Sequence, residues 1–367
     1  MKGILDEVIR EMEDEYSNDD LYNIKSWGAD LTFREIISMY DEDELVKPEL
    51  QRNYVWTKAE ASRFIESLLF GLPIPSIFLA RTKEEKHLII DGYQRIMTVR
   101  DYVKGKFSHD GVVFRLTNSK RINERWRNKA FIELSDSDQR RIRNTTIHAI
   151  IFEQIKPSDE DSSLYQVFER INTGGRTLNP QEIRNCVYQG PLNSLLISLN
   201  SLPSWRLLFG TESPDVRMLD LELILRFMFF STNYKSIVSS DKRVVLKKSL
   251  NDFMGKRENN GEGAIERLRN SFTMTMNFIM DRFGEAAFFS ITKGKKRLHF
   301  HPAIFDAISV ATFNMLSSDS RARAKDFSTA QFDLLTDTLF TSAISEKTTD
   351  PINIKTRVDK AVHYLFT

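Results

Sequence analysis

The sequence has 367 residues, of which 41% are hydrophobic and 28% charged, and its net charge is only +1. A chain of this length exceeds what one hydrophobic core usually fills, so we expect two domains in a soluble, globular protein. The balanced charge excludes a globally basic surface, so a site for nucleic acid or another anion must be a local patch. The single cysteine, Cys186, excludes an intramolecular disulfide framework and a metal site built from several cysteines.

Two features of the sequence predict a cytoplasmic protein that does not associate with a membrane. The first residues, Met-Lys-Gly-Ile-Leu-Asp-Glu, lack the apolar core of a signal peptide. The most apolar segment, residues 221–230, contains Glu222 and Arg226 and is too short to span a bilayer.

Residues 1–25 are predicted to form an acidic amphipathic helix. Its apolar stripe consists of Ile4, Leu5, Val8, Ile9 and Met12. Acidic residues fill the other faces, as expected of a helix with one buried side. Such a helix packs on the protein's own body or binds a partner, and the pattern leaves both interpretations open.

Residues 26–157 are predicted to form a small domain with a mixed sheet. Capping signals predict helices at residues 31–40 and 58–70, the second of which begins with a capping box from Thr57 to Glu60. Short apolar runs predict strands, with the last one closing the sheet. These strands are expected at residues 76–80, 88–90, 112–116 and 147–152.

One stretch, residues 87–100, predicts an anion site between a strand and a helix. The strand is expected to end at Asp91, and a helix with apolar residues at helical spacing is expected from Tyr93. A helix N-terminus favours phosphate, and Gly92 lets a phosphate approach the backbone. Arg95 offers a planar fork of donors, and Asp91 can hold a divalent metal or orient a water. The alternative is an ordinary strand-to-helix turn with a surface arginine.

Residues 51–56 form a second stretch with candidate ligand contacts. It combines polar or cationic residues with aromatic ones, namely Gln51, Arg52, Tyr54 and Trp56. Such side chains could stack on a base and hold phosphate. They could equally anchor the loop by its aromatic rings, with Arg52 paired to a carboxylate.

The strongest basic concentration lies between residues 120 and 143. It consists of Lys120, Arg121, Arg125, Arg127, Lys129, Arg140, Arg141 and Arg143. These residues could face DNA. Interspersed acidic residues favour the alternative, a solvated helix face.

Residues 158–367 are predicted to form an all-α domain. Its helices are expected at residues 162–171, from 180, and at 220–230, 242–254, 263–283, 302–316 and 329–343. Cys186 is expected to pack in the helix from 180 rather than act as a nucleophile. The glycine-bearing loop at 172–179 could close over a ligand or form a plain corner. His299 and His301 beside a basic run are interpreted as the entry to a helix at Pro302, with a catalytic role as the alternative.

Three motifs make the chain resemble the N-terminal domain of GmrSD-type restriction systems, within the ParB/sulfiredoxin-like superfamily. The first comprises Gln51-Arg52-Asn53-Tyr54-Val55-Trp56, Ile65-Glu66-Ser67-Leu68 and Gly71-Leu72-Pro73-Ile74-Pro75. The second is Ile90-Asp91-Gly92-Tyr93-Gln94-Arg95 with Thr98, which is similar to an Asp-Gly-Gln-Gln-Arg signature. The third is Phe168-Glu169-Arg170-Ile171-Asn172-Thr173-Gly174-Gly175 with Leu178 and Glu182. Together they cover residues 31 to about 190.

The resemblance implies an α+β fold, with a small mixed-sheet ParB/sulfiredoxin-like domain followed by the helical domain. It also implies a nucleoside triphosphate with Mg²⁺, and hydrolysis in which Asp91, Gln94 and Arg95 are catalytic and Asp91 holds the metal. The expected nucleotide-binding residues are Gln51, Arg52, Tyr54, Trp56, Asp91, Gly92, Tyr93, Gln94, Arg95, Asn172, Thr173 and Arg176. Tyr93 stands where the signature has its first glutamine, which weakens the expectation of hydrolysis more than that of binding.

The implied function is a sensor or regulator in anti-phage defence. No nuclease domain of the type found in longer family members is evident, so we expect a separate effector nuclease as partner. DNA and a second copy of the chain are further candidate partners. The alternatives are a non-enzymatic module that binds DNA or a partner, and a nuclease in its own right.

Overall fold

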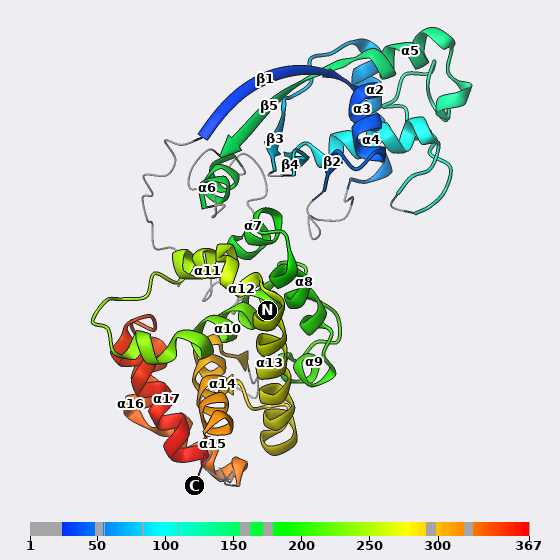
Figure 1. The fold of residues 1–367 in the computed structure, drawn as a ribbon. Helices are drawn as coiled ribbons and strands as arrows, with labels where there is room; N and C mark the ends of the chain where they lie inside the picture. The colour runs from blue at the N-terminus through cyan, green and yellow to red at the C-terminus, as the bar shows by residue number, and fades with distance from the viewer. Residues whose placement is uncertain are drawn as a thin grey trace. The chain divides into compact units, whose positions relative to one another are not determined.

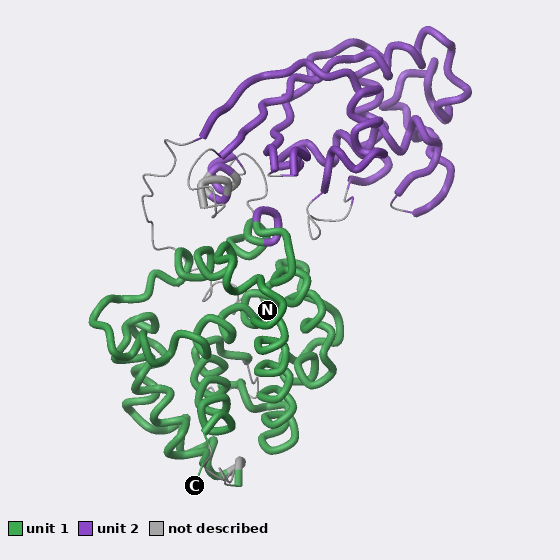
Figure 2. The backbone as a smooth tube through the Cα atoms, viewed as in Figure 1, with its two compact units in different colours: residues 1–17, 178–184, 188–367 green, residues 18–177, 185–187 purple. Residues whose placement is uncertain are grey.

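The computed structural model describes residues 24–47, 54, 56–82, 84–108, 110–154, 162–171, 179–290, 299–318 and 326–366. The chain divides into two compact units, coloured separately in Figure 2. The α/β unit contains residues 18–177 and 185–187, and the helical unit contains residues 1–17, 178–184 and 188–367. A mixed sheet in the first unit and a helical second unit confirm the predicted α+β class. The predicted helix at residues 1–25 lies almost wholly outside the described residues.

The α/β unit is built on one five-stranded mixed sheet. Its strands are β1 (Ile24–Thr32), β2 (Leu45–Val46), β3 (Ile77–Arg81), β4 (His87–Asp91) and β5 (Thr146–Gln154). They lie in the order β1-β5-β3-β4-β2 (Figure 1). β1 and β5 pair antiparallel, as do β3 and β4, whereas β3 pairs with β5 and β2 pairs with β4 in parallel.

Helices cover one face of this sheet and close the core of the unit. They are α2 (Phe33–Asp41), α3 (Lys58–Phe70), α4 (Tyr93–Lys104) and α5 (Asp136–Asn144). A short 3-10 turn at Phe131–Glu133 and helix α6 (Ser162–Ile171) complete the unit. Ile77, Leu79 and Ile89 from the sheet pack in one apolar cluster with residues of these helices, such as Ile65 and Ile96. Removal of these side chains from water is the main source of stability.

Local capping signals determine where the helices begin and end. Thr32 and Thr57 each form a capping box with the glutamate three residues later, as predicted for Thr57. Gly71 ends α3 in the left-handed conformation.

Two strand predictions differ from the structure, and the long edge strand β1 was missed. The predicted strand at 147–152 is part of β5, which lies between β1 and β3 and does not close the sheet. β1 was not predicted, because it is stabilised by its long ladder with β5 and carries charged residues and a glycine. Residues 112–116 form only isolated bridges, and Phe114 is buried among the rings of Phe107 and Tyr102. The apolar run there serves an aromatic cluster rather than a strand.

The remaining elements are mostly helices. They are α7 (Pro180–Val187), α8 (Pro191–Asn200), α9 (Pro203–Phe209), α10 (Leu219–Val238), α11 (Leu246–Gly255), α12 (Arg257–Asn260), α13 (Glu262–Phe283), α14 (Pro302–Ser317), α15 (Phe327–Thr336), α16 (Thr338–Ser345) and α17 (Pro351–Leu365). Two short strands, β6 (Phe289–Ser290) and β7 (His299–Phe300), form a separate ladder. Across the described residues, no helix combines the length and the apolar character that crossing a bilayer requires.

Helix α10 lies at the centre of the helical unit and packs on α8, α11, α13, α14 and α17. Its buried charges are each paired with another element. Glu222 pairs with Arg184 at 2.7 Å, and Arg226 pairs with Asp306 of α14 at 2.5 Å. Because an unpaired buried charge is strongly destabilising, these pairs restrict which neighbours α10 can accept.

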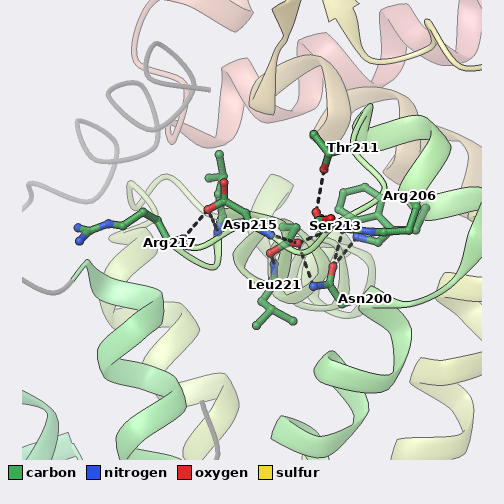
Figure 3. A network of polar contacts seen from close by, with 10 residues as sticks. Asn200, Arg206, Thr211, Ser213, Asp215, Arg217 and Leu221 are labelled. Carbon is green, nitrogen blue, oxygen red and sulfur yellow. Dashed lines mark hydrogen bonds and ion pairs between the residues drawn. The ribbon is translucent and has the colours of Figure 1, made fainter. Parts of the chain in front are cut away.

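A polar network surrounds the N-terminus of α10 (Figure 3). Arg206 donates to Asn200 Oδ1 at 2.6 Å, and Asn200 Nδ2 donates to Asp220 Oδ2 at 2.9 Å. Asp220 Oδ2 also accepts from the backbone N–H of Asp215 at 2.9 Å. The loop before α10 is therefore joined to α8 and α9 through buried polar groups.

The sequence analysis located most of the longer helices but missed several. The helix predicted at 329–343 is in fact two, because Asp337 ends α15 and caps α16 by accepting from Phe340 N–H. α8, α9 and α17 were not predicted, although each starts with a proline at a position that favours a helix start. Pro302 begins α14 as expected, and Cys186 is buried.

Candidate nucleotide site

The predicted strand-to-helix turn is present between β4 and α4. β4 ends at Asp91, and α4 begins at Tyr93. Gly92 lies between them with a φ of 106°, a conformation that residues with a side chain rarely adopt. A Cβ on Gly92 would lie 2.3 Å from Cγ2 of Ile77, the first residue of β3. The turn therefore needs glycine for its backbone conformation and for the close approach of β3.

The guanidinium group of Arg95 ties this turn to the chain just before β3. Its Nη1 donates to the backbone carbonyls of Pro75 at 2.7 Å and Ser76 at 2.8 Å. Its Nη2 donates to the carboxylate of Asp91. Because the donor is charged, each of these bonds is stronger than a neutral one.

The exposure of the two charged side chains differs. The Arg95 side chain is only 12% exposed, whereas the Asp91 side chain is 45% exposed. Asp91 is thus the charged group of the turn that solvent or a ligand can reach most readily. Arg95 orients it from below the surface.

The first turns of α4 also contact two aromatic residues that the sequence predicted for the site, Tyr54 and Trp56. The side-chain carbonyl of Gln94 accepts from the backbone N–H of Trp56 at 3.2 Å. The backbone carbonyl of Gln94 accepts from the Thr98 hydroxyl at 2.7 Å, and the Tyr54 hydroxyl lies 2.7 Å from the Thr98 oxygen. The structure therefore brings Tyr54, Trp56 and Gln94 together.

Tyr54 anchors the loop that contains it. Its ring is buried and meets Phe107 edge to face at 5.2 Å. Burial raises the pKa of the Tyr54 hydroxyl to about 12, so the group stays protonated at neutral pH. These contacts favour the loop-anchoring interpretation for Tyr54. For Trp56, whose ring meets Phe64 edge to face at 5.5 Å, stacking on a base stays a prediction.

Tyr93 occupies the position of the signature's first glutamine, and its side chain is buried. Burial is the largest of the causes that raise its pKa, and hydrogen bonding with Tyr40 acts in the same direction. The ammonium nitrogen of Lys47 lies 4.9 Å from the centre of the Tyr93 ring. The sequence analysis did not include Lys47 among the site residues, because it lies 46 positions before Tyr93 and only the folded sheet brings the two together.

A comparison with protein families identifies the domain that contains this turn. The model of the GmrSD restriction endonuclease N-terminal domain matches residues 33–189. Residues 33–189 are a GmrSD-type N-terminal domain. The match begins at α2 and includes the Asp91–Arg95 turn, and it links the chain to restriction-type systems. No curated protein matches the chain.

Several predicted site residues of the GmrSD-type domain lie outside the described residues. They are Gln51, Arg52, Asn172, Thr173 and Arg176. Their roles stay predictions. From the third motif, residues 168–171 end helix α6, and Glu182 completes a capping box with Asn179 at the start of α7 and pairs with Arg217 at 3.3 Å.

The carboxylate of Asp91 is the candidate metal ligand of the GmrSD-type domain. Within the described ranges, no group of three or more His, Cys, Asp or Glu side chains could hold a metal ion by itself. A single carboxylate nevertheless suits Mg²⁺ that arrives with a nucleotide, because Mg²⁺ commonly uses one or two carboxylates together with substrate phosphates and waters.

Three of the basic residues between 120 and 143 form hydrogen bonds within the domain through their side chains. Arg125 donates to both carboxylate oxygens of Asp138 at 3.0 Å. Arg127 donates to the Ile122 carbonyl, and Arg141 donates to the Leu69 carbonyl at 2.7 Å. These bonds give the three arginines a structural role, while contact of the basic residues with DNA stays a prediction.

Replacing Gly92 by alanine should destabilise the domain by about 2–4 kcal/mol. About 1–2 kcal/mol arises from the left-handed backbone, and a further 1–2 kcal/mol from the clash with Ile77. Gly105 is the matched control, because it ends the same helix with a φ of 80° and a Cβ there would meet nothing within 4 Å. Urea unfolding should therefore show a smaller loss for Gly105→Ala. Equal losses would contradict the clash.

Replacing Arg95 by alanine should destabilise the domain by about 2–4 kcal/mol, because it leaves the Pro75 and Ser76 carbonyls without their charged donor. Arg100 provides the control on the same helix, since its side chain is more exposed (29% against 12%) and its surface pair with Asp41 is worth about 1 kcal/mol or less. Thermal unfolding of both variants measures the difference. An Arg95 variant no less stable than the Arg100 variant would show that the tie contributes little.

Proposed function

We propose that this chain is a nucleotide-binding, NTP-hydrolysing sensor or regulator of a prokaryotic restriction-type defence system, acting with a separate effector nuclease. The observation that carries the proposal is the Asp91–Arg95 turn within the matched domain. There, a half-exposed carboxylate lies beside the start of a helix. Effector and DNA are the partner classes that the restriction family suggests.

The start of α4 suits a phosphate group. The N–H groups of the first helical turn and the positive end of the helix dipole both favour an anion. Gly92 gives the turn the backbone conformation from which α4 starts, and it leaves room for Ile77 behind the turn. In this proposal the triphosphate lies against the turn, and Gln94 and Arg95 maintain the geometry around it.

Asp91 is the residue proposed to hold Mg²⁺. When bound with a triphosphate, Mg²⁺ neutralises charge on the phosphate oxygens and so lowers the barrier to transfer of the terminal phosphoryl group to water. Arg95 holds the Asp91 carboxylate in place through the contact described above. Asp91 could also orient the attacking water.

Binding without turnover is a second candidate function. Tyr93 favours it, because a buried phenol replaces the first glutamine of the signature and cannot offer an amide to a water. In that case the domain would report the presence of nucleotide to a partner without consuming it.

A thermal-shift panel of ATP, GTP, CTP and UTP, each with Mg²⁺, tests the proposal. A ligand at 100 times its Kd adds ~2.7 kcal/mol of stability, which should raise the Tm by several degrees. The expected result is a clear shift with at least one triphosphate and none with the matching nucleoside. An unchanged Tm with all four at millimolar concentration would refute nucleotide binding.

Replacing Asp91 by asparagine should abolish phosphate release and leave much of the nucleotide binding intact. The amide keeps the shape and an acceptor for Arg95 but lacks the charge needed for the metal. Asp30→Asn is the control, because Asp30 is an exposed carboxylate on the edge strand β1. Phosphate release measured for both variants at saturating nucleotide separates the roles. Release from Asp91→Asn at the wild-type rate would make Asp91 structural, and no release from the wild type would favour the second candidate.

A further inference from the structure

Besides Mg²⁺, a triphosphate is commonly held by a cationic side chain, and Arg95 is poorly placed to be that side chain. Its two terminal nitrogens already donate to Pro75, Ser76 and Asp91, and the side chain is largely buried. Releasing it would leave two backbone carbonyls without this donor. A cationic side chain without such hydrogen bonds could bind an anion without first breaking them.

Lys47 is such a cation and lies beside the turn. It directly follows β2, which pairs in parallel with β4. The carboxyl ends of both strands therefore lie at the same edge of the sheet, where α4 begins. There the Lys47 ammonium lies 4.9 Å from the centre of the ring of Tyr93, the first residue of α4.

The charge of Lys47 is poorly compensated. Among the described residues, no carboxylate forms an ion pair with it. The side chain is half-buried, and this burial lowers its pKa, while Cys186 acts in the opposite direction. The Tyr93 ring offers a cation–π contact, which only partly replaces the lost hydration. A half-buried cation without a carboxylate partner gains more from a bound anion than an exposed one does.

Resting on the proposed function, we propose that Lys47 binds a phosphate group of the nucleoside triphosphate, and that Arg95 is a positioning residue. Tyr93 then has a role of its own: its ring holds the lysine side chain over the turn. In this proposal, tyrosine in place of the signature's first glutamine goes together with Lys47, rather than Arg95, as the source of positive charge for the phosphate.

Calorimetric titration with ATP, GTP, CTP and UTP, each with Mg²⁺, and with inorganic tripolyphosphate tests this inference. Lys47→Met keeps an unbranched chain on the Tyr93 ring but removes the charge, and Lys47→Gln is a second charge-free variant. Both should weaken binding of the triphosphates and of tripolyphosphate roughly ten- to a hundredfold. Lys47→Arg should lose much less, since it keeps the charge and the ring contact.

Lys25→Met is the matched control. The Lys25 ammonium also lies over an aromatic ring, that of Trp27 at 5.7 Å, but on the opposite edge strand of the sheet. Its affinity for each probe should equal that of the wild type. Equal losses for Lys25→Met and Lys47→Met would overturn the inference, because a general charge effect would explain both.

The remaining outcomes separate the inference from the proposed function. If the wild type binds a triphosphate and both charge-free Lys47 variants bind it equally well, Lys47 has no phosphate role and the proposed function stands. If the wild type binds none of the probes, both are overturned. A loss that grows from nucleoside monophosphate to triphosphate would support a direct contact with phosphate, because a purely structural defect would weaken all nucleotides alike.

Discussion

The guanidinium group of Arg95 joins the turn between β4 and α4 to the chain just before β3, which lies 19 to 20 positions earlier in the sequence. From its position in α4 it donates to the carbonyls of Pro75 and Ser76 before β3 and to the carboxylate that ends β4. Because Gly92 lies against Ile77, the helix can begin only where β3 and β4 are already adjacent. The position of Asp91, and hence the whole candidate site, depends on this tie.

This constraint changes how a signature arginine is interpreted. From the sequence alone, an arginine in the first turn of a helix suggests a direct phosphate ligand. In the folded domain the same planar fork fits backbone carbonyls and a carboxylate, and it leaves Asp91 as the more accessible group. This geometry is the basis for the division proposed above between a buried arginine that positions the turn and a lysine that binds phosphate.

The helices of the helical unit are likewise joined by charged side chains, which form buried ion pairs in its core. Asp306 accepts ion pairs from both Arg226 and Arg357, while Glu222 pairs with Arg184. Each pair joins α10 or α14 to another helix. A shift of one helix would therefore leave a buried charge without its partner. The network before α10 adds hydrogen bonds through Asn200 and Asp220 (Figure 3). Such pairs favour one arrangement of the helices over others with similar apolar contacts.

The sequence by itself determined the features that depend on neighbouring residues. The capping box at Thr57, the glycine after α3, the strand ending at Asp91 and the helix from Tyr93 were all predictable, because caps and periodicity act within a few residues. The family resemblance also rested on short motifs of this kind. Only the tertiary structure decided the place of β5 inside the sheet and the existence of β1, since strand pairing joins distant segments. The same reason explains the candidate site: the two backbone carbonyls that Arg95 bonds and the ring beneath Lys47 lie 19 to 46 positions away, and no local pattern encodes them.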